Sequence, residues 1–216
     1  MNNLSLYHLD REPKNKLDKN PLLLLLHGYG SNEEDLFSFA TQLPDEYLII
    51  SARAPHAIPP YGNAWYAINF DADMNKFSDD VQAAASRDLI AKFIDEVVTN
   101  YPVDKDKVTL IGFSQGAILS YAAALTYPDK IARVAALSGY FNPDIIDSVD
   151  KEKAAKLQFF ISHGSVDQVI PIEWARKAPE ALKNFGIMAE YHEYPVGHGV
   201  APQNFYDLLD WLNKTA

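Results

Sequence analysis

The chain has 216 residues, a formal net charge of -10, 48% hydrophobic residues and no cysteine. This length favours a single domain over residues 1–216 with a substantial core. The lack of cysteine excludes a disulfide framework, a thiolate zinc site, an iron–sulfur cluster and a cysteine nucleophile. The negative charge opposes binding to nucleic acid or to an anionic lipid surface, so neither is expected as a partner.

Signals for export or membrane insertion are weak in this sequence. The first residues lack the basic start and the apolar stretch of a signal peptide. The most apolar run, Leu22–Leu26, is much shorter than the ~20 residues of a membrane span. We therefore expect a cytoplasmic protein without stable membrane insertion. The sequence leaves a homodimer open.

Short apolar runs alternate with helical patterns along the chain. The runs with strand character are Leu22–Leu26, Tyr47–Ser51, Val108–Gly112, Val134–Leu137, Leu157–Ser162 and Met188–Tyr194, with Leu4–Leu9 as a candidate antiparallel edge strand. Helices are expected after a capping box at Ser31–Glu34, from Ser78 to Tyr101, over Ser114–Leu125, over Pro171–Lys183 and around Phe205–Leu212. This alternation predicts an α/β protein with a mostly parallel sheet and helices on both faces. Ligands bind such sheets at the carboxyl ends of the strands.

A candidate nucleophile follows the third run, in Gly112-Phe113-Ser114-Gln115-Gly116. A sharp strand-to-helix turn strains the central serine, and glycine two residues away on either side avoids clashes. The hydroxyl then stands at the helix N-terminus, whose positive potential suits a developing oxyanion. This pattern is typical of the nucleophile elbow, so we predict Ser114 as the nucleophile. The alternative is a serine that only caps the helix.

A serine nucleophile needs a base and a carboxylate that orients the base. His198 is the predicted base, because its flanking glycines let the loop turn the ring toward the serine, whereas His192 lies within a strand pattern. Asp167 is the predicted carboxylate, with an Asx-turn ahead of Pro171 as its alternative role. The other candidate acids, Asp144, Asp147 and Asp150, lie in a polar stretch typical of solvated surface. The order serine, aspartate, histidine is that of α/β-hydrolases.

The loop His27-Gly28-Tyr29-Gly30 joins the first apolar run to the next helix. In hydrolases with this elbow, one N–H from such a loop and the N–H after the nucleophile form the oxyanion hole. We assign these donors to Tyr29 and Gln115. A plain strand-to-helix turn is the alternative.

The chain resembles the phospholipase/carboxylesterase family of small serine carboxylesterases, which are related to acyl-protein thioesterases. The matching segments are Leu26–Gly30, Trp65-Tyr66 with Asp71, Gly112–Gly116, Leu137–Gly139, His163–Pro171 and Gly197-His198. The resemblance implies an α/β-hydrolase fold without a large cap domain, hydrolysis of esters and in some members of thioesters, and an oxyanion hole from Tyr29 and Gln115. Two features of this sequence differ from the pattern of acyl-protein thioesterases. Tyr29 is larger than the residue common there in acyl-protein thioesterases, and the short N-terminal stretch predicts fewer edge strands.

The expected function is hydrolysis of a small-molecule carboxylic ester of short to medium acyl chain, through an acyl-enzyme and without a metal or organic cofactor. Trp65, in the aromatic and proline-rich stretch from Ala52 to Phe77, is the candidate for lining an acyl or alcohol pocket, with core packing as its alternative. Other activities left open are those of an acyl-thioesterase, a lysophospholipase, a lipase or a peptidase. A non-catalytic ligand-binding protein of the same fold is a further alternative.

Overall fold

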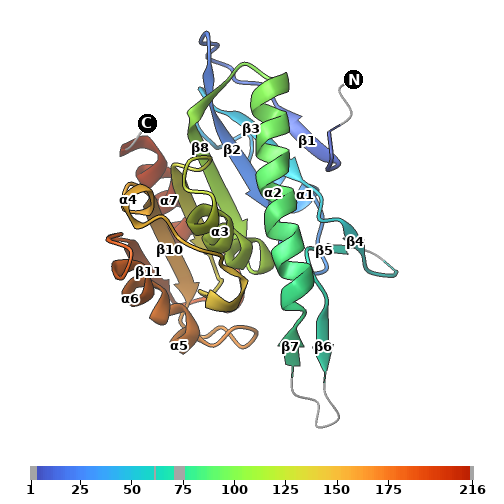
Figure 1. Ribbon diagram of the computed structural model, residues 1–216, viewed down its shortest axis with the longest axis vertical. Helices are drawn as coiled ribbons and strands as arrows, with labels where there is room; N and C mark the ends of the chain where they lie inside the picture. The colour runs from blue at the N-terminus through green and yellow to red at the C-terminus, as the bar shows by residue number, and fades with distance from the viewer. Residues whose placement is uncertain (1–3, 61, 71–75, 215–216) are drawn as a thin grey trace.

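The computed structural model describes residues 4–60, 62–70 and 76–214. Its centre is a seven-stranded sheet with the order β1-β3-β2-β8-β9-β10-β11 (Figure 1). The strands are β1 (His8–Arg11), β2 (Asn20–Leu26), β3 (Leu48–Ala52), β8 (Val103–Phe113), β9 (Arg133–Leu137), β10 (Gln158–Gly164) and β11 (Glu190–Tyr194). β1 pairs antiparallel with β3 at one edge, and the remaining neighbours are parallel. The predicted mostly parallel sheet is confirmed.

The run of leucines in β2 follows from the position of this strand inside the sheet. Leu22, Leu24 and Leu26 belong to the hydrophobic cluster on one face, while Leu23 and Leu25 belong to the cluster on the other. Successive side chains of a strand point to opposite faces. A strand that is covered on both faces therefore needs an apolar residue at each position, and all of β2 is buried.

The helices cover both faces of the sheet, as predicted. α2 (Asp80–Asn100), α3 (Gln115–Thr126) and α6 (Lys177–Lys183) pack on the face that carries Leu24, and α1 (Glu34–Phe37) and α7 (Pro202–Lys214) pack on the opposite face (Figure 1). Shorter elements in the loops are a 3-10 turn (Pro143–Ile145), α4 (Lys151–Ala154) and α5 (Ile172–Ala175). Within the described residues, no element is large enough to form a separate cap domain over the sheet.

The first predicted helix is shorter than its apolar spacing indicates. Glu33, rather than Ser31, is the N-cap residue of α1 and makes no side-chain capping hydrogen bond, while the Ser31 hydroxyl donates to the Asp35 carboxylate at 2.8 Å. α1 ends at Phe37, yet Ala40 and Leu43 are buried in the turns that follow. Burial of the apolar residues therefore does not require the helix to continue. The helix expected over Pro171–Lys183 is likewise divided, into α5 and α6.

Two small antiparallel hairpins occupy the aromatic stretch that the sequence leaves without elements. They pair β4 (His56–Ala57) with β5 (Asn63–Ala64), and β6 (Ile68–Phe70) with β7 (Lys76–Ser78). Figure 1 shows that the second hairpin projects beyond the end of α2. Asp71, one of the residues in the family resemblance, lies outside the described residues.

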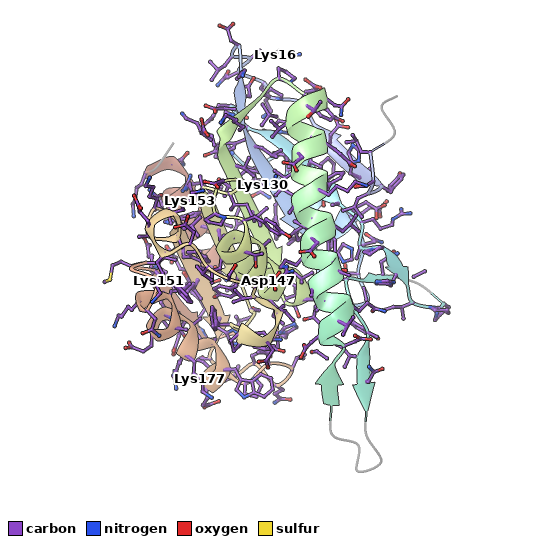
Figure 2. All side chains as sticks on the ribbon, viewed as in Figure 1. Lys16, Lys130, Asp147, Lys151, Lys153 and Lys177 are labelled. Carbon is purple, nitrogen blue, oxygen red and sulfur yellow. The ribbon has the colours of Figure 1, made fainter. Side chains whose placement is uncertain are left out.

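Several basic side chains on the surface are matched by nearby carboxylates. Lys130 pairs with Asp95, and Lys153 pairs with Asp129 at 2.5 Å (both lysines are labelled in Figure 2). Such pairs reduce the local positive potential that a phosphate backbone would need. Among the residues that the structure describes, no helix combines the length and the apolar character needed to cross a membrane.

Candidate active site

Ser114 lies in the sharp turn between β8 and α3. Its backbone has φ 54° and ψ -115°, a conformation that non-glycine residues rarely adopt. A Cβ at Gly112 would lie 2.3 Å from the Gly116 carbonyl oxygen, and one at Gly116 would lie 2.0 Å from the Leu26 carbonyl oxygen. Both glycines are therefore required for this turn. The Ser114 side chain makes no capping hydrogen bond to α3, which removes the interpretation of this serine as a helix cap.

The structure brings the three predicted triad residues together in one chain of hydrogen bonds. His198 Nε2 lies 3.0 Å from Ser114 Oγ, and His198 Nδ1 lies 2.7 Å from Asp167 Oδ2. The Asp167 side chain is fully buried and the His198 side chain is 18% exposed. The imidazole thus connects a buried carboxylate to a hydroxyl near the surface, which is the geometry of base-assisted nucleophilic attack.

The buried carboxylate of Asp167 has several hydrogen-bond donors. Its Oδ1 accepts the N–H groups of Val169 at 2.8 Å and Ile170 at 3.0 Å. Burial pushes the pKa of Asp167 upward, but hydrogen bonds from His198, Ile170 and Val169 outweigh burial and hold the pKa below its usual value. The fully buried His163 places Nε2 3.3 Å from Asp167 Oδ2 and 2.9 Å from the Ile170 carbonyl oxygen. Asp167 is therefore held as an ionised group that can stabilise an imidazolium.

The alternative candidates for base and acid lie elsewhere. His192 Nε2 lies 2.9 Å from Glu190 Oε1, and its ring packs between Phe160 and Tyr194. The carboxylates of Asp144, Asp147 and Asp150 are exposed, Asp147 pairs with Arg87, and Asp150 caps α4. These contacts leave Asp167 and His198 as the pair that faces Ser114.

The two predicted oxyanion donors lie in the loop after β2 and at the start of α3. Gln115 is the first residue of α3, so its N–H has no acceptor within the helix. The loop that carries Tyr29 passes close to the nucleophile, because a Cβ at Gly28 would lie 3.2 Å from the Cβ of Ser114 and 3.1 Å from the Phe113 ring. The Tyr29 side chain is 45% exposed.

The side chain of Gln115 makes contacts that the sequence did not indicate. Its Oε1 accepts the Trp65 N–H at 2.9 Å, and its Nε2 donates to the Tyr66 carbonyl at 2.8 Å. The Trp65 indole N–H in turn donates to the His27 carbonyl at 2.9 Å. Trp65 is completely buried, and a buried ring does not line an open pocket. Its position therefore suits support of the loop His27–Gly30 rather than the predicted contact with substrate.

The glycine that matters for the His198 loop is not one of its neighbours. A Cβ at Gly197 or Gly199 would meet no atom within 4 Å, and neither residue has a positive φ. By contrast, a Cβ at Gly164, at the end of β10, would lie 2.2 Å from the Gly197 carbonyl oxygen. The loop of His198 therefore packs closely against β10 at Gly164, whereas Gly197 and Gly199 have room for a side chain. That the flanking glycines aim His198 stays a prediction.

Apolar side chains are exposed on the loops that carry the site. Tyr29 follows β2, Val166 and Val169 flank Asp167, and Trp174 lies on α5, where it packs edge-on against Tyr140. In residues 4–60, 62–70 and 76–214, no three acidic or histidine side chains are grouped as ligands of a metal ion. The loops that carry Tyr29 and Asp167 thus expose apolar side chains.

Two features together define an α/β-hydrolase. One is the parallel sheet with an antiparallel edge strand, and the other is the serine on a strained turn directly after the central strand of that sheet. Residues 12–216 match the profile of the family described as Phospholipase/Carboxylesterase. The chain belongs to the phospholipase/carboxylesterase family and is a carboxylic ester hydrolase.

Individual relatives agree with this assignment. An acyl-protein thioesterase 1 of Mycosarcoma maydis is 25% identical over 94% of this chain and 94% of its own length. A probable carboxylesterase of Oryza sativa subsp. japonica is 30% identical, but the match spans 52% of this chain and 43% of that protein. The crystal structure of esterase PE8 has a TM-score of 0.80 and 25% identity over 99% of both chains. A Bacillus cereus carboxylesterase has the same fold, with a TM-score of 0.84 and 20% identity over 97% of this chain and 94% of that one.

Proposed function

We propose that this protein hydrolyses carboxylic esters of short to medium acyl chain through Ser114, His198 and Asp167. The observation that carries the proposal is the continuous path from Ser114 Oγ through the imidazole to the buried carboxylate, at 3.0 Å and 2.7 Å. The exposed apolar side chains on the loops that carry Tyr29 and Asp167 support an uncharged acyl or alcohol group in the substrate. We also propose that the protein is cytoplasmic and acts on small molecules.

In the first step, Ser114 Oγ attacks the ester carbonyl carbon while His198 Nε2 takes the hydroxyl proton. The carbonyl oxygen gains the negative charge, and the N–H groups of Tyr29 and Gln115 stabilise it. The tetrahedral intermediate collapses, the bond to the alcohol oxygen breaks, and His198 returns its proton to the leaving alcohol. This leaves an acyl group on Ser114.

In the second step, His198 takes a proton from a water molecule, whose oxygen attacks the acyl carbon. The same two N–H groups stabilise the second tetrahedral intermediate. Collapse releases the carboxylic acid, and the proton on His198 returns to Ser114 Oγ. Throughout both steps Asp167 holds the tautomer with a proton on Nδ1 and stabilises the imidazolium.

The second candidate function is hydrolysis of acyl thioesters or lysophospholipids. It is favoured by the similarity to a fungal acyl-protein thioesterase 1 along nearly the whole chain. Its chemistry is the same, because the acyl-enzyme does not depend on whether an alcohol or a thiol leaves. The size of the leaving group and the acyl chain therefore separate the two candidates.

The test is hydrolysis of p-nitrophenyl butyrate by the wild type and by Ser114→Ala. We expect the variant to lose a factor on the order of 10⁴ to 10⁶ in kcat. The exposed Ser148→Ala serves as the matched control and should keep wild-type activity. A fluorophosphonate should label the wild type at Ser114 and leave Ser114→Ala unlabelled. Substantial activity in Ser114→Ala would overturn the assignment.

A series of esters and thioesters with increasing acyl length then identifies the substrate class. A maximum of kcat/KM at short or medium oxygen esters supports the first candidate. A maximum at long-chain thioesters supports the second. Cleavage of an amide panel in preference to both would assign the protein to the peptidases.

A further inference from the structure

His27 is a completely buried histidine at the end of β2, next to the loop that carries Tyr29. Both of its ring nitrogens have backbone partners. Nδ1 lies 2.8 Å from the Gly28 carbonyl oxygen, and Nε2 lies 3.0 Å from the amide nitrogen of Ala54. The reaction described above does not use this ring, although it is in contact with the oxyanion loop.

The two partners fix the tautomer of the ring. The Ala54 N–H is a donor, so Nε2 must be the nitrogen without a proton. The single proton of the neutral ring is then on Nδ1, which donates to the Gly28 carbonyl oxygen. Burial lowers the pKa of His27, which also favours the neutral ring. One tautomer thus satisfies both contacts.

The bond to Gly28 determines the direction of the next amide. The Gly28 carbonyl and the Tyr29 N–H belong to the same peptide unit, which is planar and trans, so they point in opposite directions. When the ring holds the carbonyl oxygen inward, the N–H turns away from the buried ring. We propose that His27 is a positioning residue that aims the Tyr29 N–H at the oxyanion by binding the Gly28 carbonyl. This inference rests on the proposed function, in which Tyr29 is an oxyanion donor.

Further contacts connect this loop to the second donor. The Ser31 N–H also donates to the Gly28 oxygen, at the longer distance of 3.3 Å. The His27 carbonyl accepts the Trp65 indole N–H, and the Trp65 backbone N–H is held by the side chain of Gln115. The backbone of residue 115 supplies the other donor. One network of hydrogen bonds therefore fixes the two donors relative to each other, which preorganises the oxyanion hole.

Two substitutions at His27 separate its two contacts. In His27→Asn the amide nitrogen takes the place of Nδ1, so the donor to Gly28 is kept and the acceptor for Ala54 is lost. In His27→Gln the amide oxygen takes the place of Nε2, so the acceptor is kept and the donor is lost. The two variants thus have opposite effects on the oxyanion loop, and both remove the imidazole.

The measurements are kcat and KM for p-nitrophenyl butyrate, Tm, and the Ki of a trifluoromethyl ketone that forms a tetrahedral adduct on Ser114. For His27→Gln we expect kcat to fall by about tenfold to 10²-fold with KM nearly unchanged, and Ki to rise by a similar factor. His27→Asn should keep most of the wild-type kcat, while its Tm falls because the Ala54 N–H loses its acceptor. Wild-type kcat and Ki in folded His27→Gln, or activity losses that only follow the loss of folded protein, would overturn the inference.

A wild-type measurement keeps the inference testable if His27→Gln does not fold. The ¹⁵N spectrum of histidine-labelled protein should show His27 protonated at Nδ1 and not at Nε2; the opposite tautomer would contradict the proposal. If hydrolysis by the wild type does not depend on Ser114, the proposed function is wrong, and the inference about His27 is then wrong as well. Ser114-dependent hydrolysis together with an unaffected His27→Gln removes the inference alone.

Discussion

Gly164 allows the loop of His198 to pack against the end of β10. A Cβ at this position would lie 2.2 Å from the Gly197 carbonyl oxygen and 2.3 Å from the Val196 carbonyl oxygen. In Gly164→Ala the loop must shift, and the imidazole moves relative to Ser114. A misplacement of about 1 Å can cost about 10²-fold in rate, so we expect kcat to fall by about that factor. Steady-state kinetics on p-nitrophenyl butyrate measure this loss.

Gly197→Ala is the matched control for that substitution. It adds the same methyl group one residue before His198, where a Cβ meets no atom within 4 Å. We expect its kcat to remain close to that of the wild type. Equal losses in the two variants would show that flexibility of the loop, rather than its packing on β10, determines the position of His198.

His27 also makes stability depend on pH. Burial is the main cause of its lowered pKa, the Arg53 charge acts in the same direction, and the Gly28 hydrogen bond and the Glu33 and Asp35 carboxylates oppose it. The unfolded chain binds a proton at the usual pKa of ~6.5, whereas the folded protein does not until lower pH. The stabilisation is thus complete above ~6.5 and is lost as the pH falls toward the folded-state pKa.

We therefore expect the free energy of unfolding to fall on acidification by more in the wild type than in His27→Gln. Urea titrations of both proteins at about pH 7.5 and about pH 5.5 measure the difference, and the shared contributions of the other histidines and carboxylates cancel. Parallel pH profiles for the two proteins would show that His27 titrates alike in the folded and unfolded chains.

At the level of elements, Arg133 at the start of β9 holds the C-terminal end of α7. Its Nη2 donates to the Trp211 carbonyl at 2.8 Å, and its guanidinium lies 4.0 Å over the Trp211 ring. Positive charge is favourable at a helix C-terminus, where carbonyl groups lack partners within the helix. For Arg133→Met we expect a loss of about 2 kcal/mol in the free energy of unfolding. This corresponds to a decrease of about 4–8 °C in Tm, measurable by circular dichroism.

Arg176→Met is the control for a surface arginine. Arg176 binds Glu193 through two nitrogens, at 2.7 Å and 2.9 Å, but its side chain is 53% exposed. Solvent screens such a pair, so Tm should remain close to that of the wild type. A larger decrease for Arg176→Met than for Arg133→Met would contradict the role given to the buried arginine.

The strands could be predicted from the sequence better than the helices. Continuous apolar runs such as Leu22–Leu26 identify strands because both faces of the sheet are covered. Within β8, however, the polar residues 104–107 extend the strand beyond the predicted Val108–Gly112, and residues 105–107 are exposed, so this part of the strand has no apolar run to reveal it. The hairpins β4–β5 and β6–β7 are too short to show a period-two pattern. Near Leu43, the apolar residues that recur at helical spacing lie in turns rather than in a helix.

In the site, too, features set by neighbouring residues could be predicted from the sequence, and features set by distant residues could not. The position of Ser114 follows from a five-residue pattern whose glycines act on their immediate neighbours. The burial of Trp65 depends on Gln115 and His27, which lie far from it in the sequence. The residues next to Trp65 in the sequence therefore did not reveal that its side chain is buried. The contact of Gly164 with the His198 loop is likewise visible only once β10 and the loop are placed side by side.

At the scale of the whole molecule, the described loops over the sheet carry two small hairpins and short helices rather than a cap domain. Ser114 is 8% exposed and the His198 side chain 18% exposed, so the site reaches the surface without a large movement. We therefore expect no activation at an oil–water interface. The rate on tributyrin should follow saturation without a step at the solubility limit, in contrast to the behaviour expected of a lipase.

The measurement is the initial rate across a tributyrin series that spans the solubility limit, with detergent-free dispersions. Soluble p-nitrophenyl butyrate, assayed in the presence of the same dispersions, controls for inhibition by the oil phase. Ser114→Ala reports any background hydrolysis. A sharp rise in rate above the solubility limit would mean that a segment over the site opens at the interface, and it would move the assignment from esterase toward lipase.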